Sequence, residues 1–277
     1  MLGAIIGDIV GSRFEWNNHR NKNFELFTKD CFVTDDSIIT LAVGKAIMET
    51  QKRTSFLKTG QEYDNDFYAL LYNNTIKYMQ KIGRNYPNCG YGLKFHSWMF
   101  SDNPQPYNSF GNGSAMRVSA AGLVARNEIE TKLLSETITK VTHNHEEGLK
   151  GAEATAKAIF FARKGFTIPE IKVKMSHYYD LNFKIDAIRD SYKFNETCQD
   201  TVPQAIVSFL ESESFEDAVR IAISVGGDSD TLAAITCSIA ESYYDIPDYI
   251  KEKALSYLNS ELRTIYDEWV EFMKCRH

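Results

Sequence analysis

Apolar residues recur at helical spacing along almost the whole chain, and this periodicity constrains the fold more than any other feature. Within residues 37–50, Leu41 and Met48 lie on one face of the predicted helix, while Val43 and Ile47 lie on another. A helix that is apolar around most of its circumference is typical of the centre of a fold. The same spacing predicts further helices near residues 152–165, 205–210, 218–223, 232–243 and 249–273. The sequence therefore predicts an all-α protein.

Two stretches depart from this pattern. Residues 24–33 ("FELFTKDCFV") suit a short strand, and residues 83–113 are rich in Gly, Asn and Pro and predict a long loop. Long loops inside compact domains are usually functional. No Pro-, Gly- or Ser-rich linker divides the 277 residues, of which 43% are hydrophobic. We therefore expect residues 1–277 to form one domain with an elaborated loop.

The charge and cysteine content exclude several classes of protein. A formal charge of −6 argues against nucleic acid or an anionic membrane as the main partner. The five cysteines are scattered and give neither a disulfide framework nor a zinc ligand set, which suits a reducing compartment. The apolar start "MLGAIIGDIVGS" is interrupted by Asp8 and predicts a buried helix, not a signal peptide. No apolar run is long enough to span a membrane, so we expect a cytoplasmic protein.

Two clusters of oxygen-bearing side chains each stand directly before an apolar helix. The first is "TDDS" at residues 34–37, and the second is "GGDSDT" at residues 226–231. Each cluster taken alone is explained by helix capping, because Ser, Thr and Asp satisfy free N–H groups at a helix N-terminus. Yet a cap needs one side chain, and each cluster contains two carboxylates and a threonine.

Both following helices are predicted to be central, which would bring the two clusters inside the fold. Buried carboxylates repel one another unless cations neutralise them. Carboxylate and hydroxyl oxygens, with no Cys or His among them, suit hard cations such as Mg²⁺, Mn²⁺ or Ca²⁺. If the clusters meet, they form a site for two metal ions. The sequence alone does not show that they meet.

The first predicted helix, "GAIIGDIVGSRFE", adds a third element. Gly3, Gly7 and Gly11 are four residues apart and share one face, which permits close helix packing. Asp8 and Glu15 share a face if the helix extends that far, and for Asp8 we expect a structural role as a solvated or capping carboxylate.

Together these segments resemble the ADP-ribosylglycohydrolase family, which includes the dinitrogenase-reductase-activating glycohydrolases and the ADP-ribosylhydrolases. The resemblance is carried, in the family's order, by "GAIIGDIVGSRFE", "TDDS", "GNGSAMRVS" (111–119), "THNHEEGLKGAEATAKAIFFARKG" (142–165), "TVPQAIVSFL" and "GGDSDTLAAI". It implies a compact all-α orthogonal multi-helix bundle with a binuclear Mg²⁺ or Mn²⁺ centre. The implied metal ligands are Thr34, Asp35, Asp36, Asp228, Asp230 and Thr231. Glu15 matches a glutamate that reaches the metal or the scissile bond in several members.

The resemblance also implies where ADP-ribose binds. Gly111, Asn112, Gly113 and Ser114 match a loop that wraps the diphosphate and the distal ribose, although a lone "GNG" is otherwise an ordinary turn. Phe110 is a candidate to stack on adenine or a core residue, and His143 a candidate contact on the phosphate or ribose side.

Two neighbouring positions bear on the same site. Arg117 either forms a structural ion pair or contacts phosphate. Some members carry an aspartate, proposed as a base, where this chain has Ser109, which gives Glu15 more weight.

The function implied by the resemblance is hydrolysis of the glycosidic bond between ADP-ribose and an acceptor, often an arginine or serine side chain of a protein. Glu15, Asp35 and Asp36 are the candidate catalytic carboxylates, and the reaction is expected to pass through an oxocarbenium-like state. One alternative is hydrolysis of a free derivative such as O-acetyl-ADP-ribose, or of ADP-ribosylated nucleic acid. The negative net charge of the protein counts against the nucleic acid substrate. Another is a non-catalytic binding or structural protein on this fold.

Overall fold

The computed structural model describes residues 1–53 and 63–276, and within them every regular element is a helix. The only β-type pairing in these residues is an isolated bridge between Gly111 and Thr197. The helices are α1 (Leu2–Gly11), α2 (Asp35–Arg53), α3 (Asn65–Gly83), α4 (Leu93–Phe100), α5 (Gly113–Met116), α6 (Ser119–Val124), α7 (Glu128–Thr139), α8 (Glu146–Arg163), α9 (Ile168–Met175), α10 (Ile185–Ile188), α11 (Cys198–Leu210), α12 (Phe215–Ser224), α13 (Ser229–Ala240), α14 (Asp248–Leu255) and α15 (Ser260–Lys274). The all-α prediction is confirmed.

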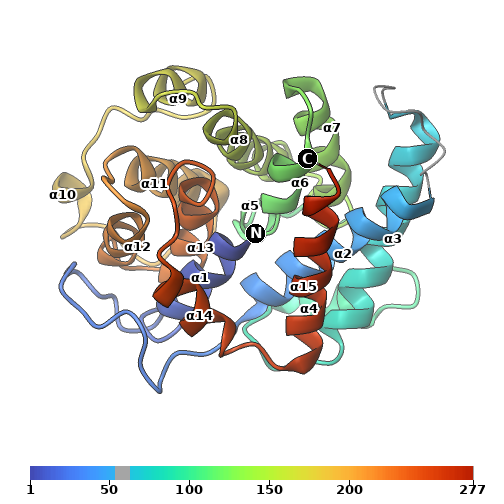
Figure 1. Ribbon diagram of the computed structural model, residues 1–277, viewed down its shortest axis with the longest axis horizontal. Coiled ribbons are helices and arrows are strands. Elements are labelled where there is room, and N and C mark those ends of the chain that lie inside the picture. The colour runs from blue at the N-terminus through green and yellow to red at the C-terminus, as the bar shows by residue number, and fades with distance from the viewer. Residues whose placement is uncertain (54–62, 277) are drawn as a thin grey trace.

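Helices α1 and α13 lie side by side at the centre of the fold, and every residue of both is buried (Figure 1). Helix α2 contacts α1, and α3 and α15 pack on its outer faces. On the other side, α8, α11 and α12 surround α13. A single cluster of buried apolar side chains includes residues from Met1 to Trp269, so the described residues share one hydrophobic core.

Glycines allow α1 and α13 to approach until their backbones touch. A Cβ atom added to Gly3 would lie 2.1 Å from the carbonyl oxygen of Cys237, and one added to Gly7 would lie 2.3 Å from that of Ala233. At Gly11, the added atom would lie 2.5 Å from the Cα atom of Asp230. The packing role predicted for these glycines is confirmed, and the last contact places the end of α1 against the acidic first turn of α13.

The sequence predictions for the central helices are confirmed by α2, α8, α11, α12 and α13. Three details differ. Residues 24–33 contain no strand, residues 83–113 contain helix α4, and residues 249–273 form two helices that break between Leu255 and Ser260. Helix α4 has only eight residues, so it offers too few turns for a periodic pattern to stand out.

We expect Gly7→Ala to destabilise the protein, because its methyl group would collide with the backbone of α13. Overpacking of this kind typically costs roughly 1–3 kcal/mol, and a backbone neighbour yields less readily than a side chain. Thermal unfolding followed by circular dichroism measures the loss. The control is Gly92→Ala at the start of α4, where an added Cβ meets nothing within 4 Å. Equal melting temperatures for the two variants would contradict the close contact.

Candidate functional site

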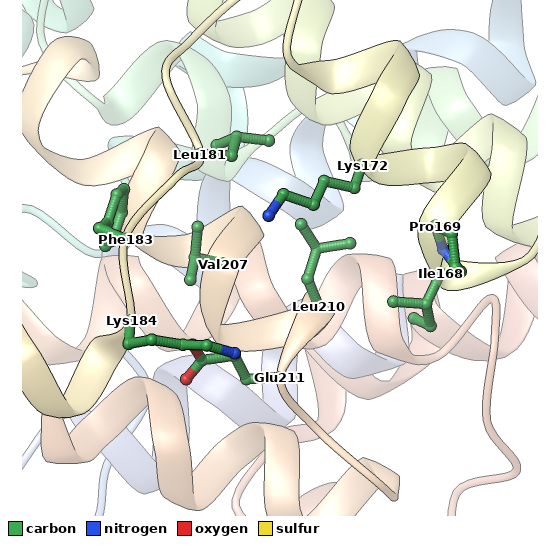
Figure 2. Close-up of a pocket in the computed structure, with 9 residues that line it drawn as sticks. All are labelled: Ile168, Pro169, Lys172, Leu181, Phe183, Lys184, Val207, Leu210 and Glu211. Atoms are coloured by element: carbon green, nitrogen blue, oxygen red, sulfur yellow. The ribbon is translucent and has the colours of Figure 1, made fainter.

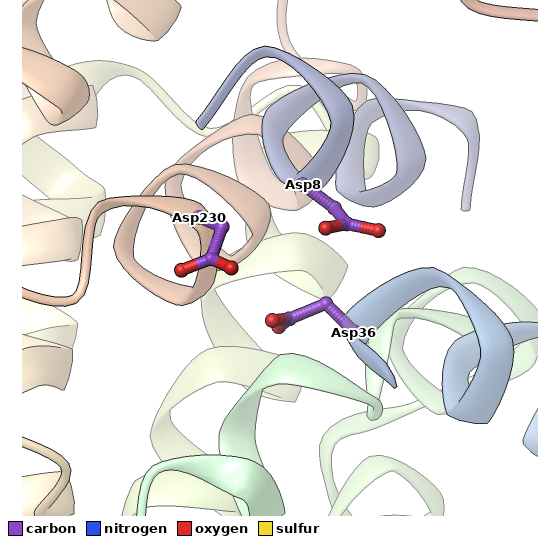
Figure 3. Close-up of side chains that lie close together, drawn as sticks. All are labelled: Asp8, Asp36 and Asp230. Atoms are coloured by element: carbon purple, nitrogen blue, oxygen red, sulfur yellow. The ribbon is translucent and has the colours of Figure 1, made fainter. Parts of the chain in front are cut away.

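The two acidic clusters predicted from the sequence meet in the structure. Figure 3 shows Asp8 of α1, Asp36 of α2 and Asp230 of α13 pointing toward one another from three different helices. One carboxylate oxygen from each lies within 4.8 Å of the others, and all three residues are buried. A direct hydrogen bond joins the clusters, because the hydroxyl of Thr231 donates to Asp36 Oδ2 at 2.9 Å. Residues 195 positions apart therefore line one site.

A second group of carboxylates shares Asp230 with the first. Glu15, Asp228 and Asp230 also offer oxygens within 4.8 Å of one another. Glu15 lies in the turn after α1, which ends at Gly11, so it does not share a helical face with Asp8 as the sequence suggested. Asp35 belongs to neither group. Its side chain is only partly buried and lies beside Gly90, at the edge of the cluster.

Asp8 is a site residue whose place the sequence did not reveal. It is fully buried, so the prediction of a solvated carboxylate is wrong, whereas the capping role is confirmed. Its Oδ2 accepts hydrogen bonds from the backbone N–H groups of Thr34 and Ser37, both at 3.1 Å. The hydroxyl of Thr34 donates to Oδ1 at 2.6 Å, and that of Ser37 donates to Oδ2. The signal in the sequence was a lone carboxylate within an otherwise apolar helix.

The turn before the second cluster is held by residues that sequence reasoning also missed. Gly226 and Gly227 have φ values of +78° and +70°, a left-handed backbone conformation that residues with a side chain rarely adopt. The side chain of Asn18 accepts a hydrogen bond from the N–H of Gly227 at 3.0 Å. Arg20 donates to the carbonyl oxygen of Val225 at 2.7 Å. The loop after α1 thus fixes the approach to Asp228.

The buried carboxylates lack cationic partners. No described Lys or Arg forms an ion pair with Asp8, Asp36, Asp228 or Asp230. Asp36 Oδ1 has no hydrogen-bond partner among the residues that the structure describes. This set consists of oxygen donors alone, so it fits a hard divalent cation better than zinc or copper.

Burial is the main cause of the pKa shifts in the cluster. It raises the pKa of Asp8 to about 6 and that of Asp228 above its ordinary value, even though hydrogen bonds to both act in the opposite direction. For Asp36 and Asp230, burial and neighbouring carboxylates together raise the pKa well above the usual range. Burial, followed by the charges of Asp228, Glu196 and Asp8, raises the pKa of Glu15 to about 7. Bound cations would reverse these shifts.

The glycine-rich loop at residues 111–114 borders the second group of carboxylates. Asn112 donates from its side chain to Asp228 Oδ2 at 2.7 Å and to the hydroxyl of Thr201 at 3.1 Å. The backbone N–H of Asn112 donates to the carbonyl oxygen of Glu196 at 2.8 Å. These contacts bring the loop against the carboxylates, as the sequence interpretation requires.

Most backbone amides of this loop are already engaged. The N–H of Gly111 donates to the hydroxyl of Ser109 at 3.2 Å, and that of Ser114 donates to the carbonyl oxygen of Gly111 at 3.3 Å. The Ser114 side chain is fully buried and donates to the same carbonyl oxygen. The loop therefore offers fewer free amide donors to a diphosphate than the sequence suggested.

The remaining candidate residues lie beside this loop. Phe110 has an exposed ring 5.2 Å from that of His145, so it is not a core residue. His143 is buried behind the loop. Arg117 is also buried, and among the described residues it makes no ion pair, so the ion-pair prediction is wrong. Its guanidinium donates to the hydroxyl of Thr142 and lies 3.0 Å from His143 Nδ1.

The sequence profile of the ADP-ribosylglycohydrolase family matches residues 1–271. The chain belongs to this family. ADP-ribosylhydrolase ARH3 of Xenopus tropicalis is 22% identical to it over 94% of this chain and 91% of that protein, and the Homo sapiens ARH3 is 23% identical over 95% and 90%. An ADP-ribosylarginine hydrolase Tri1 of Pseudomonas putida is 22% identical over 92% of this chain and 73% of that protein.

A solved structure described as an ADP-ribosylglycohydrolase-related protein complex has the same fold. It superposes with a TM-score of 0.64 at 18% identity and covers 95% of this chain and 94% of that chain. As a member of the family, this chain is a hydrolase of the ADP-ribosylhydrolase type. The carboxylates of its acidic centre lie close enough together to bind a metal ion. No helix in the described part of this glycohydrolase is long and apolar enough to cross a membrane.

A pocket elsewhere on this glycohydrolase is separate from the acidic centre. Figure 2 shows it between α9, residues 181–184 and the C-terminal end of α11. Its volume is about 220 Å³. Its lining is mostly apolar, and Lys184 Nζ lies 3.5 Å from Glu211 Oε1 at its edge. None of the candidate site residues lines it.

Removing one buried carboxylate is expected to stabilise the cation-free protein at high pH. Burial raises the pKa of Asp36 in the folded state, so the folded state binds this proton more tightly than the unfolded chain. The resulting stability is present at low pH and is lost as pH rises through the raised pKa. In chelator, Asp36→Asn should therefore melt above the wild type at about pH 8 and lose this advantage toward about pH 5.

Differential scanning fluorimetry measures both the pH dependence and the effect of cations. Adding Mg²⁺ or Mn²⁺ should raise the melting temperature of the wild type more than that of Asp36→Asn, because the variant lacks one anionic oxygen. Asp248→Asn, whose side chain is exposed, should behave like the wild type in every condition. A variant at residue 36 that melts below the wild type at high pH without cations would contradict the electrostatic account.

Proposed function

We propose that this protein is a metal-dependent hydrolase that cleaves the glycosidic bond between ADP-ribose and an acceptor side chain of a protein, of the arginine or serine type, and releases ADP-ribose. The single observation that carries the proposal is the acidic centre, in which Asp230 belongs to two groups of three carboxylates. Asp36 lies close to Asp230 in the first group, and Glu15 and Asp228 lie close to it in the second, so Asp230 can join two cations held side by side. We further propose that residues 1–277 form one such domain in a reducing compartment such as the cytoplasm, which suits five free cysteines.

Two divalent cations, Mg²⁺ or Mn²⁺, are the proposed cofactors. Asp8 is left out of the proposed ligand set, because its two oxygens already accept four hydrogen bonds and orient Thr34 and Ser37. Asp36, in contrast, has an oxygen without a partner. The proposed ligands are therefore those predicted from the sequence: Thr34, Asp35, Asp36, Asp228, Asp230 and Thr231. When bound, such cations hold hydroxyl groups of the substrate and lower the pKa of a bound water.

The residues of the chain supply the remaining chemistry. Glu15 has a partly exposed side chain and lies close to Asp228 and Asp230, so it can accept or return a proton at the edge of the centre. Asp35, also partly exposed, is the second candidate. The buried carboxylates are aligned to stabilise positive charge that develops on the ribose as the glycosidic bond breaks. Asn112 would hold the loop at residues 111–114 against this centre through its hydrogen bond to Asp228.

ADP-ribose is proposed to lie across residues 110–114 with its ribose directed to the carboxylates. The exposed ring of Phe110 offers a stacking surface for adenine. Gly111, Asn112, Gly113 and Ser114 would follow the diphosphate, with His143 behind them. Relatives named as an ADP-ribosylarginine hydrolase and as ADP-ribosylhydrolases support a substrate that contains ADP-ribose.

A direct assay tests the proposal. Purified protein is incubated with ADP-ribosyl-arginine, ADP-ribosyl-serine peptide and O-acetyl-ADP-ribose, each with Mg²⁺, Mn²⁺ or chelator, and released ADP-ribose is quantified. We expect release from an ADP-ribosylated side chain that depends on the cation. Asp228→Asn and Asp230→Asn should each lower kcat by about 100-fold or more, while Asp248→Asn should not. If no ADP-ribose is released from any of the three substrates, a binding protein without catalytic activity becomes the better explanation.

The pH dependence identifies the proton acceptor. If Glu15 accepts a proton in the reaction, activity rises with pH as its carboxyl group ionises. Bound cations favour the ionised form, so the rising limb should lie below the value of about 7 that holds for the cation-free site. In Glu15→Gln, we expect kcat to fall by about 100-fold and the rising limb to disappear. A limb that persists unchanged in this variant would assign the role to another group, with Asp35→Asn as the next variant to test.

A further inference from the structure

Arg117 occupies an unusual environment for an arginine. It is 1% exposed and has no carboxylate partner among the described residues. Burial lowers its pKa to about 10, so it stays protonated at neutral pH, and its Nε has no hydrogen-bond partner. A buried charge without a counter-ion is costly, and it persists where it serves an interaction other than an ion pair.

That interaction is with His143. One terminal nitrogen of the Arg117 guanidinium lies 3.0 Å from His143 Nδ1. A guanidinium has only donors, so at this distance Nδ1 must accept the hydrogen bond. The hydroxyl of Thr142 lies 2.7 Å from the same ring nitrogen and itself accepts from Arg117, which leaves its own proton free to point at Nδ1. The contact with Arg117 therefore places the ring proton on Nε2, and the Thr142 hydroxyl can donate to Nδ1 in that tautomer.

The ring is also held in the neutral state. Burial, and next the positive charge of Arg117, lower the pKa of His143 well below its ordinary value. The ring of Tyr107, 5.9 Å away, is the aromatic neighbour on the other side. His143 is thus a neutral imidazole with a single N–H donor at Nε2.

This donor points at the glycine-rich loop and has no acceptor within the described residues. His143 Nε2 lies 3.6 Å from the position that a Cβ atom would take on Gly111 and 3.7 Å from that on Gly113. His143 is only 5% exposed, yet no hydrogen bond from Nε2 is formed. Glycine at both positions leaves open the space in front of the ring, so a bound molecule that crosses the loop can reach the donor.

We infer that Arg117 is a positioning residue that fixes His143 as a neutral Nε2–H donor to a phosphate oxygen of the substrate as it crosses Gly111 and Gly113. Arg117 is too deeply buried to touch the substrate and acts through the ring. A phosphate oxygen is the favoured acceptor because it is anionic and would lie in front of a ring backed by the buried positive charge of Arg117, and because most loop amides already donate elsewhere and leave it few other donors. The assignment of this oxygen to the diphosphate of ADP-ribose rests on the proposed function.

Nuclear magnetic resonance of ¹⁵N-histidine-labelled, Mg²⁺-loaded protein tests the tautomer directly. The signals of His143 are assigned by their absence in His143→Gln. At about pH 7 we expect a neutral ring protonated at Nε2 in the ligand-free protein, with the Nε2–H signal shifting when ADP-ribose is added. A ring protonated at Nδ1, or on both nitrogens, would overturn the inference. This measurement does not depend on the function of the protein.

Variants separate positioning from structural support. The Gln side chain places a donor near the position of Nε2, whereas Asn places its donor near Nδ1. Calorimetric titration with ADP-ribose should therefore show His143→Gln within a few-fold of the wild type, and His143→Asn weaker by about tenfold or more. Arg117→Met should weaken binding by about tenfold and give a mixture of tautomers, and Arg117→Lys, also a pure donor, should restore part of both.

The outcomes distinguish this inference from the proposed function. A purely structural role for Arg117 would lower the melting temperature in both Arg117 variants while leaving the tautomer and the affinity unchanged, and that result would overturn the inference. If Arg117→Met does not fold, the tautomer of the wild type and the two His143 variants still decide. If His143 of the wild type is protonated at Nε2 but the protein binds no ADP-ribose, the proposed function is overturned. The role of Arg117 in fixing the tautomer of His143 then still stands.

Discussion

The contact between α1 and α13 is the constraint on which the site depends. Three glycines on one face of α1 let its backbone lie directly on that of α13, and the last of them, Gly11, stands against Asp230. This contact brings Asp8 and the turn that carries Glu15 to the first turn of α13. The hydrogen bond between Thr231 and Asp36 then joins α2 to the same point. A side chain larger than hydrogen in the contact would separate the carboxylates that form the acidic centre.

Two buried electrostatic systems of opposite sign flank the glycine-rich loop. On one side, Asn112 donates a hydrogen bond to Asp228, which belongs to the group of buried carboxylates that form no ion pair with a described Lys or Arg. Such a group favours bound cations. On the other side, Arg117 lies behind His143 and forms no ion pair within residues 1–53 and 63–276. A molecule that carries both phosphates and a ribose matches this arrangement, because its anionic part meets the donor side and its hydroxyl-bearing part meets the acidic centre. On the proposed function, the phosphates and the scissile bond of the substrate would lie on opposite sides of this one short loop.

The sequence predicted the long helices well because each spans several turns of a regular apolar pattern. It failed where the pattern was too short or was interrupted, as in α4 and at the break between α14 and α15. At the site, it identified both acidic clusters from residue types alone and predicted that their oxygens suit hard cations. It misjudged Asp8 as a solvated carboxylate and offered an ion pair for Arg117, because the spacing of residues in the sequence shows neither the burial nor the partner of a lone charged residue.

The sequence by itself therefore determined the helical class, the central helices and the oxygen-rich chemistry of the centre. Only the tertiary structure decided which oxygens face one another, that Asp35 lies at the edge while Asp8 lies inside, and that His143 presents Nε2 to the loop. The physical reason is that helical periodicity fixes which face of a helix is buried, but not where along that face another helix crosses it. The crossing of α1 over α13 is set by backbone contact at glycines, and the hydrogen bonds of the site follow from it.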